Sequence, residues 1–469
     1  MSDAGSLQKI RTMLGDNGYI DDPVRMEPYL TSWRNGWVGK SPLIAFPSST
    51  AQVAELVTFC AKNKIAMVPQ GGNTGLVGGG VPSQNGKEIV INLSRMNKIH
   101  SIDKVASTVT VEAGVILQTL QTYAADAGFL FPLSIAAEGS AEIGGLISTN
   151  AGGTAVLRYG NMRDLIVGIE AVTADGKIYS SLKKLPKDNT GYDLGRTFIG
   201  AEGTLGVVTG ATLKLFPPLR QKVTSILALN NPAMALDLLA EFRSKAGEYL
   251  TAFELMPHAA IKLATKHISG ARFPGKDDAP YYMLVEFGST SQSFPLRVVF
   301  EDLAGHALNK NQILDAVIAE NEAQAKQFWQ LRENISESMR KEGQGIHFDI
   351  SLPLDQIPDF LKNMEAQIKT VSPIIMPVPF GHIGDGNIHY NMYFAAPSPN
   401  FPVLKKRVQE IVYADVKHRH GSISAEHGIG VDRKAELLSY KSADEIAMMR
   451  KIKHALDPDG LMNPGKIFD

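Results

Sequence analysis

The chain has 469 residues, a length that predicts two to four structural units rather than one compact core. Hydrophobic residues make up 44% and charged residues 20%, which fits a soluble globular protein and argues against a disordered, fibrous or membrane-spanning one. The net charge of −1 argues against a nucleic-acid or anionic-membrane partner held by bulk electrostatic attraction.

The single cysteine, Cys60, rules out an internal disulfide and a cysteine-based zinc or iron–sulfur site. Residues 1–5 include an acid and no apolar stretch, and no uncharged apolar run is long enough to span a bilayer. We therefore expect a cytoplasmic protein without a transmembrane segment, or one held peripherally at the inner face of the membrane.

The first half of the chain alternates helix and strand signals. Ser49 and Thr50 are suited to cap a helix in which Val53, Leu56, Val57 and Cys60 recur on one face. Apolar and amphipathic runs then predict, in chain order, a strand at 65–68, strands at 88–93 and 108–111, a helix at 115–127, and strands at 165–172 and 206–215.

Pro217 and Pro218 mark a boundary, because two prolines neither continue a helix nor fit inside a central strand. Beyond it the pattern changes to strands separated by helices, which predicts a second domain of sheet plus helices. The predicted elements are strands at 225–228, 251–255 and 281–287, a helix at 233–244, a long polar helix over 313–341 and a loop-rich tail from 456.

Glycine is clustered, and six of the ten residues from Gly71 to Gly80 are glycine. A glycine-rich turn after a strand lets successive N–H groups approach a phosphate, although a flexible surface loop is an equally good interpretation of one isolated cluster. The cluster lacks the Walker A pattern, and the chain holds no Rossmann G-x-G-x-x-G, so a Rossmann-bound NAD is disfavoured. Two further clusters, at 143–153 and 199–206, favour a long ligand with a central pyrophosphate.

These segments, with Arg158-Tyr159-Gly160 and Asp188–Leu194, resemble the vanillyl-alcohol-oxidase (PCMH-type) flavoproteins, in the branch that contains D-lactate dehydrogenase and D-2-hydroxyglutarate dehydrogenase. The resemblance covers nearly the whole chain. It implies an α+β protein with a PCMH-type FAD-binding domain of two α/β subdomains at 1–216. A substrate- and metal-binding cap domain of antiparallel sheet and helices follows at 217–430, and a C-terminal segment, 431–469, returns to the FAD domain.

The resemblance also implies which residues contact FAD. They are Pro69, Gln70, Gly71, Gly72, Asn73, Thr74, Gly75, Ser148, Thr149, Asn150, Gly152, Gly153, Glu202, Gly203, Asn463 and Lys466. For Asn463 and Lys466, the competing interpretation is a loop-rich C-terminus that is held in place only by packing. Residues 69–82 contain no His or Cys, so we expect non-covalent FAD.

A second group of chemistry-bearing residues follows. His389 and Asn391 are two apart on a predicted strand and share a face, and the turn before them can bring His382 close. Two histidines at this spacing are more often unrelated surface or core residues than parts of one site. Glu426-His427, taken alone, fits a solvated turn. The resemblance implies instead a divalent-metal site, with zinc as the first choice, whose ligands are His382, His389 and Glu426.

The same resemblance suggests roles in oxidising a D-2-hydroxy acid. His427 is the candidate general base, and Asn391 is expected to contact the substrate. Arg332 and Ser336 are four apart on a predicted helix and would bind the substrate carboxylate, although a surface arginine paired with Glu333 is the alternative. His347 stands where hydroxyglutarate-type relatives usually carry Lys, which leaves D-lactate and D-malate open beside D-2-hydroxyglutarate.

The predicted function is FAD-dependent, metal-assisted oxidation of a D-2-hydroxy acid to the 2-oxo acid. The electron acceptor implied by the family is electron-transferring flavoprotein or a quinone, and a homodimer is a further hypothesis. The competing classes are a metallohydrolase, which leaves the glycine clusters unexplained, and a flavin-binding sensor without turnover.

Overall fold

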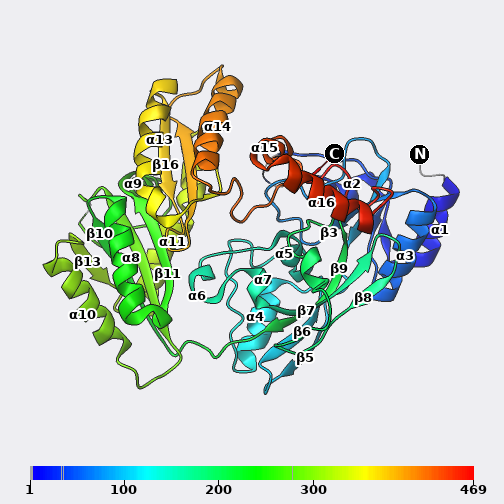
Figure 1. Ribbon diagram of the computed structural model, residues 1–469, viewed down its shortest axis with the longest axis horizontal. Coiled ribbons are helices and arrows are strands. Elements are labelled where there is room, and N and C mark those ends of the chain that lie inside the picture. Colours follow the sequence, from blue (N-terminus) through cyan, green and yellow to red (C-terminus); the bar gives the residue numbers. More distant parts are fainter. Residues whose placement is uncertain (1–3, 33, 35, 277, 469) are drawn as a thin grey trace. The chain divides into compact units, whose positions relative to one another are not determined.

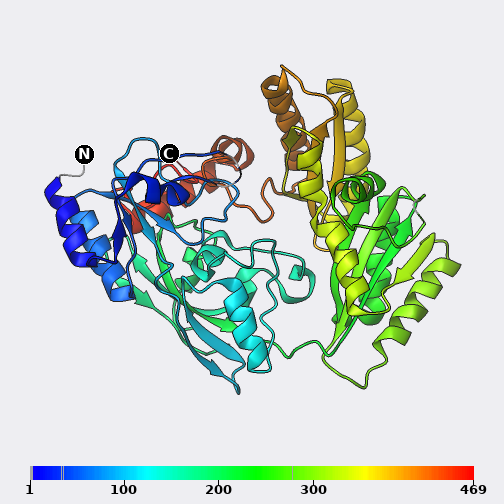
Figure 2. The ribbon, with the colours of Figure 1, turned by 180° about the vertical axis from the view of Figure 1, so that it is seen from behind.

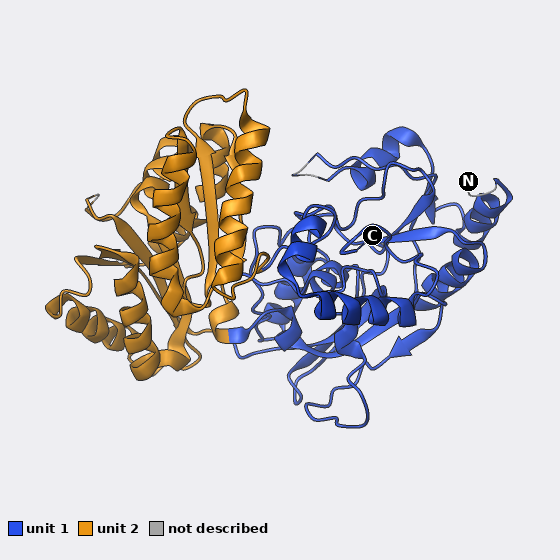
Figure 3. Cartoon of the chain, turned by 45° about the horizontal axis from the view of Figure 1, so that its top comes forward, with its two compact units in different colours: residues 1–153, 159–218, 426–469 blue, residues 154–158, 219–425 orange. Residues whose placement is uncertain are grey.

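The computed structural model describes residues 4–32, 34, 36–276 and 278–468, so Met1, Ser2 and Asp3 lie outside the described residues. The chain forms two compact units, drawn in different colours in Figure 3. Unit 1 comprises residues 1–153, 159–218 and 426–469, and unit 2 comprises residues 154–158 and 219–425. The sequence predicts boundaries at 216/217 and 430/431, and the structure changes unit at 218/219 and 425/426.

The elements of unit 1, labelled in Figure 1, are α1 (Ala4–Leu14), β1 (Tyr19–Ile20), α2 (Pro23–Leu30), β2 (Ile44–Ala45), α3 (Thr50–Lys62), β3 (Ala66–Gln70), β4 (Glu88–Asn92), β5 (Ile99–Asp103), β6 (Thr108–Glu112), α4 (Leu117–Asp126), α5 (Ile143–Thr149), α6 (Val156–Tyr159, which begins in unit 2), α7 (Met162–Leu165), β7 (Ile166–Thr173), β8 (Ile178–Ser180), the 3₁₀ helix η1 (Gly195–Phe198), β9 (Gly206–Lys214), α15 (Lys434–Tyr440) and α16 (Ala443–Leu456).

Unit 1 contains two sheets. The first has the order β1-β2-β4-β3, in which β4 is parallel to both β2 and β3, and the second is antiparallel with the order β5-β6-β9-β7-β8. Every residue of β4 is buried, as expected for a strand paired in parallel on both sides. The combination of helices with a mixed and an antiparallel sheet confirms the α+β prediction.

The helix predicted after Ser49 is confirmed. Ser49 is the N-cap of α3, and its side chain accepts a hydrogen bond from the N–H of Gln52. The four residues predicted to share a face, Val53, Leu56, Val57 and Cys60, are fully buried in one core cluster of the unit. This helix covers the strand that leads into the first glycine cluster, so its packing fixes where that cluster begins.

The elements of unit 2 are β10 (Gln221–Leu229), α8 (Pro232–Ala246), the 3₁₀ helix η2 (Gly247–Tyr249), β11 (Leu250–Pro257), α9 (His258–His267), β12 (Tyr281–Ser289), α10 (Leu296–Asn309), β13 (Asp315–Ile318), α11 (Glu322–Glu333), α12 (Ile335–Glu342), β14 (Gly345–Ile346), β15 (Ile350–Ser351), the 3₁₀ helix η3 (Leu354–Gln356), α13 (Ile357–Val371), β16 (Ile375–Phe380), β17 (Asn387–Phe394) and α14 (Phe401–His418).

Unit 2 also has two sheets, and all their strand pairs are antiparallel. One has the order β11-β12-β10-β13, and in the other β17 pairs with β14, β15 and β16. Helices α13 and α14 lie side by side over the second sheet, as the front and rear views in Figures 1 and 2 show. No helix among the described residues is long and apolar enough to cross a bilayer.

The long helix predicted over 313–341 is wrong in its first part and interrupted in its second. Asp315–Ile318 form β13, which pairs with β10 at the sheet edge. Helix α11 begins only after Asn321, whose side chain caps it by accepting from the N–H of Gln324, and α11 and α12 are separated at Asn334. A short edge strand gains its stability from pairing, which a helical periodicity in the sequence does not reveal.

Candidate functional site

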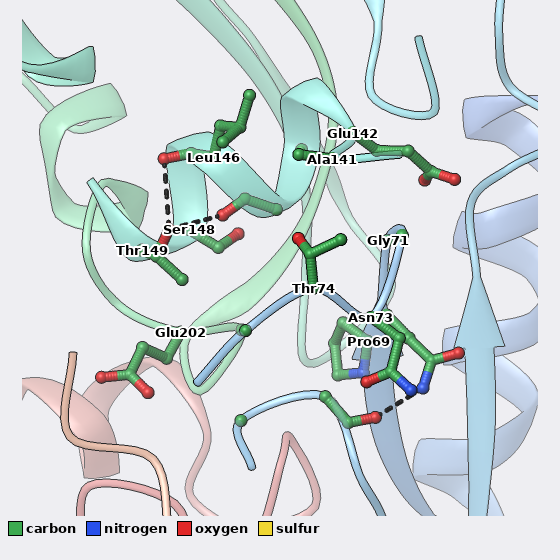
Figure 4. Close-up of a pocket in the computed structure, with 18 of the residues that line it drawn as sticks. Pro69, Gly71, Asn73, Thr74, Ala141, Glu142, Leu146, Ser148, Thr149 and Glu202 are labelled. Carbon is green, nitrogen blue, oxygen red and sulfur yellow. Dashed lines mark hydrogen bonds between the residues drawn. The ribbon is translucent and has the colours of Figure 1, made fainter. Parts of the chain in front are cut away.

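The three glycine-rich segments enclose one pocket in unit 1, with a volume of about 890 Å³ that includes its open mouth (Figure 4). The residues that line it are Pro69, Gln70, Gly71, Gly72, Asn73, Thr74, Gly75, Val77, Gly79, Gly80, Leu93, Ala113, Ala141, Glu142, Gly144, Gly145, Leu146, Ser148, Thr149, Glu202, Gly203, Val207, Val208 and His427. The expected FAD contacts at 69–75, 148–149 and 202–203 are therefore brought together, and the candidate base His427 lies in the same lining.

The first segment is held in place by side-chain amides. Gln70 donates to the carbonyls of Tyr29 and Gly80, at 2.8 and 2.7 Å, and Asn73 donates to the carbonyls of Pro28 and Thr31. Asn92, on β4, donates to the Gln70 side chain and to the carbonyl of Gly71, both at 3.1 Å. The flexible-loop interpretation therefore does not describe this segment, because its backbone is fixed from three directions.

Glycine is required in this segment for packing at one position. A Cβ at Gly72 would lie 1.9 Å from the carbonyl oxygen of Ser140, so the loop approaches the neighbouring backbone more closely than any side chain permits. At Gly75 a Cβ would meet nothing within 4 Å, which leaves that backbone facing open space. The cluster thus combines tight packing with an accessible surface.

The second segment is not the loop that its composition suggests. Residues Ile143–Thr149 form the helix α5, and Asn150 ends it in the left-handed conformation with φ 50°. Thr149 donates to the carbonyl of Gly145 at 3.0 Å, while Ser148 and Thr149 line the pocket (Figure 4). Glycine is tolerated here because α5 packs closely on Ala113, whose Cβ would lie 2.8 Å from a Cβ at Gly144.

The third segment holds the chain that carries His427. The Glu202 carboxylate accepts hydrogen bonds from the N–H groups of Ile429 and Gly430, both at 2.8 Å. A Cβ at Gly428 would lie 2.8 Å from Glu202 Oε1, so that glycine permits the close contact. Glu202 therefore lines the pocket and also positions the loop of His427.

Five of the expected FAD contacts fall outside the lining that the described residues form, namely Asn150, Gly152, Gly153, Asn463 and Lys466. Asn150 instead accepts from the N–H of Arg163. Asn463 donates to the carbonyls of Gly79 and Glu202, at 3.0 and 2.7 Å, and so ties the C-terminal segment to two loops of the pocket.

Two buried carboxyl groups set the electrostatics of the pocket. Burial raises the pKa of Glu202, and its two backbone hydrogen bonds and the charges of Arg433 and Lys466 oppose this only in part. Burial alone raises the pKa of Glu142 to about 8. Sequence reasoning did not select Glu142, although an acid inside the apolar run Ala141–Ile147 was a signal for it.

The buried carboxylate Glu254, on β11, is the centre of the site in unit 2. It accepts from Nε of Arg332 at 2.8 Å and pairs with Nδ1 of His382 at 2.7 Å. Glu254 is 1% exposed and Arg332 is 7% exposed. Burial raises the pKa of the Glu254 carboxyl, but His382 and Arg332 outweigh burial and bring the pKa down to about 2. Sequence reasoning missed Glu254, which is 128 residues from His382 along the chain.

Arg332 is a buried residue of this site and not a surface arginine. The surface alternative, pairing with Glu333, does not apply, because Arg332 is buried, bonded to Glu254 and stacked over the Phe380 ring at 4.9 Å. Arg332 and Ser336 do not share one continuous helix, because they lie in α11 and α12, on either side of Asn334. Ser336 is exposed, and His347 is half-buried.

The two histidines expected to bind metal lie next to each other in unit 2. The ring centroids of His382 and His389 are 5.4 Å apart, and Nδ1 of His389 lies 3.8 Å from the buried Asp349 carboxylate. Asn391, on the same face of β17, accepts from the N–H of Phe348 at 3.1 Å. Glu426 is the first residue beyond unit 2 and follows Ala425, whose N–H donates to the Asp349 carbonyl at 3.1 Å.

The residues present fit the groups that the sequence implied. The pocket in unit 1 offers a glycine-bounded cradle with apolar walls and convergent polar groups, as a flavin dinucleotide requires. In unit 2, a carboxylate that holds one ring nitrogen of a histidine is the usual outer support of a metal-ligating imidazole. Paired imidazoles with a nearby carboxylate suit zinc or another first-row divalent ion.

Two family models match the chain. The model for "FAD linked oxidases, C-terminal domain" matches residues 219–467, and the model for "FAD binding domain" matches residues 41–181. The first of these covers more than half of the chain, including all of β10 to α16.

Curated proteins are similar to the chain over most of its length. The chain is 37% identical over 466 residues to mitochondrial D-2-hydroxyglutarate dehydrogenase of Arabidopsis thaliana, covering 99% of this chain and 82% of that protein. It is 38% identical to D-2-hydroxyglutarate dehydrogenase of Xanthomonas citri pv. viticola, covering 96% and 93%. Among solved structures, p-cresol methylhydroxylase superposes with a TM-score of 0.76 at 15% identity, covering 99% and 96%, which concerns the fold alone.

Proposed function

Because this chain belongs to the family of FAD-linked oxidases and is related over its length to D-2-hydroxyglutarate dehydrogenases, we propose that it oxidises D-2-hydroxyglutarate to 2-oxoglutarate. It is an FAD-dependent oxidoreductase that acts on CH–OH donors. The observation that carries the proposal is the pocket of unit 1, where three glycine-rich segments and His427 form one lining. D-lactate and D-malate are the alternative substrates, because the resemblance implies a lysine where this chain has His347.

The reaction needs a proton acceptor and a hydride acceptor. When bound, FAD supplies the hydride acceptor for the hydrogen on C2 of the substrate. His427 takes the hydroxyl proton as general base, so that C2 and its oxygen become the carbonyl of the 2-oxo acid. Its loop is fixed by Glu202, which keeps the imidazole in the pocket lining.

We propose His382, His389 and Glu426 as ligands of a divalent metal, with zinc as the first choice. Such an ion, when bound, lowers the pKa of the substrate hydroxyl as it does that of bound water. Glu254 holds His382 by its Nδ1 atom, and the N–H of Ala425, the residue before Glu426, donates to the carbonyl of Asp349.

Substrate contacts remain proposals as well. We assign them to Arg332, Ser336, His347 and Asn391. The contact of Asn391 with the N–H of Phe348 supports this assignment, because it places residue 347 beside the strand of His389. Of the four, the exposed Ser336 has the weakest support in the geometry.

We further propose a reducing, cytoplasmic setting and reoxidation by electron-transferring flavoprotein or a quinone. The buried thiol of Cys60 fits such a setting, because burial raises its pKa to about 12 and no disulfide is available to it. Assembly as a homodimer is part of the same proposal.

One experiment tests the substrate and the metal together. The purified flavoprotein is mixed anaerobically with D- and L-2-hydroxyglutarate, lactate and malate, with and without a chelator, and the oxidised-flavin absorbance is followed. We expect the D-acids alone to bleach the flavin, D-2-hydroxyglutarate fastest, and the chelator to abolish bleaching. No bleaching by any acid would contradict the function, and bleaching unaffected by the chelator would contradict only the metal.

We expect the flavin to be released by acid or heat, because the described lining offers no cysteine and only one histidine as a tether, His427. Cys60 lies in the core with its thiol protonated, so it is a poor nucleophile. The measurement is the flavin absorbance of the supernatant after precipitation. Colour that stays with the denatured chain would contradict non-covalent binding.

A further inference from the structure

Glu142 lies in the lining of the FAD pocket without a role in the scheme above. Its side chain is 6% exposed, and its Oε2 atom has no hydrogen-bond partner among the described residues. Glu142 occupies the N-cap position of α5, yet its side chain makes no capping hydrogen bond. A buried polar atom without a partner is costly, which points to a partner that arrives with the ligand.

The carboxyl group lies directly against the first glycine cluster. Its Oε2 atom would be 3.3 Å from a Cβ at Gly71, so it borders the backbone of the loop at 71–75. Figure 4 shows Glu142 on the other side of Thr74 from Glu202, so the two acids occupy different parts of the lining. Gly71 and Glu142 both line the pocket, so a ligand bound against this loop would meet the carboxyl group.

The described segments that pack around Glu142 hold no cation to compensate its charge. The segments packed on it, 69–75, 112–117, 138–141 and 143–149, contain no Lys or Arg, and their other titratable residues are the acids Glu112 and Glu138. The titratable groups elsewhere in the described lining are Glu202 and His427. Burial without a counter-charge raises the pKa of Glu142 to about 8, so the group is mostly neutral at pH 7.

We propose that Glu142 enters the FAD complex as a neutral acid and donates its O–H to an acceptor oxygen of the dinucleotide, so that ionisation of Glu142 weakens FAD binding. A protonated carboxyl group has one O–H donor, whereas the ionised form only accepts. FAD carries acceptor oxygens along its length and a negatively charged pyrophosphate, which an ionised carboxylate would repel across an apolar wall. The inference rests on FAD as the cofactor and not on the identity of the hydroxy acid.

The test measures the Kd for FAD between pH 6.5 and 9.5, from the flavin fluorescence released when the holoenzyme is diluted. The variant is Glu142→Gln, whose amide stays neutral and keeps a donor, and the matched control is Glu138→Gln, the same charge change four residues earlier. For the wild type and the control we expect the Kd to rise about tenfold per pH unit above about pH 8. For Glu142→Gln, we expect the Kd to change by less than about threefold over the same pH range.

Parallel pH profiles in the wild type and Glu142→Gln would overturn the proposal. A second measurement needs no variant: calorimetry of FAD binding to the wild-type apoprotein at pH 8.5, in buffers of different ionisation enthalpy. We expect uptake of more than half a proton per FAD, roughly the ionised fraction of a group with pKa about 8, and no uptake would equally overturn it. A protein that binds no FAD at pH 6.5 would instead contradict the cofactor itself.

Discussion

Replacing Glu254 with glutamine is expected to lower the free energy of unfolding of unit 2 by about 3–5 kcal/mol. The substitution keeps the shape of the side chain but removes the negative charge that faces Arg332 and His382. Arg332 is 7% exposed, so its guanidinium would stay buried without a counter-charge. The measurement is the midpoint of urea unfolding, followed by circular dichroism.

The control is Glu286→Gln on the neighbouring strand β12. Glu286 accepts hydrogen bonds from the hydroxyls of Thr224 and Thr251 and from Nε1 of Trp329, which are all neutral donors. Loss of its charge therefore leaves none of these partners as an unpaired cation, and we expect the free energy of unfolding to fall by only about 1–2 kcal/mol. A double variant, Glu254→Gln with Arg332→Met, should recover part of the stability because it removes the buried charge. Equal losses for Glu254→Gln and Glu286→Gln would contradict the ion-pair explanation.

The metal affinity of Glu254→Gln provides a second measurement, which would not change if Glu254 had only a structural role. If His382 ligates the metal, Glu254 fixes its ring, and the loss of such an outer partner lowers metal affinity by about 10–100-fold. Zinc competition with a chromophoric chelator measures the metal affinity, in the absence of urea and at a pH at which the variant is folded. Unchanged affinity would leave the stability argument intact and would count against His382 as a ligand.

Replacing His427 with alanine is expected to slow flavin reduction by the D-2-hydroxy acid by about 10²–10⁴-fold. The side chain is the one imidazole in the described lining of the FAD pocket, and its removal takes away the acceptor for the hydroxyl proton. The fold around it is held by Glu202 through the N–H groups of Ile429 and Gly430, which the substitution leaves in place. The rate is measured by anaerobic stopped-flow, with the FAD content of the variant determined separately.

His418→Ala is the control, since His418 is exposed in the last turn of α14, and it should reduce at the wild-type rate. If the flavin of His427→Ala is reduced at a rate within about threefold of the wild-type rate, His427 is not the general base. That result would favour the alternative of a flavin-binding protein in which this histidine has no catalytic role. A variant without bound FAD would show instead that His427 supports the cofactor pocket.

The parts of the fold that were predicted correctly carry local signals. The N-cap at Ser49 and the helical spacing from Val53 to Cys60 specify α3, and the alternation in 387–394 specifies β17 with His389 and Asn391 on one face. The glycine cluster at 143–153 carries no signal for a helix because glycine is a poor helix former, but residues 143–149 form α5, which packs closely on Ala113.

The sequence by itself determined the FAD-linked family, the α+β class and about half of the pocket lining. The lining residues could be predicted because they lie in short runs of glycine and amide residues, and the fold class because helix and strand periodicities are local. The tertiary structure decided which charged groups are buried and with what partners. Glu254 meets Arg332 and His382 across 78 and 128 residues, and Glu142 loses its solvent only when α5 packs on the first glycine loop. Burial and pairing of a charge depend on elements distant in the chain, so no local pattern could have specified the partners of Glu254 or the depth at which Glu142 is buried.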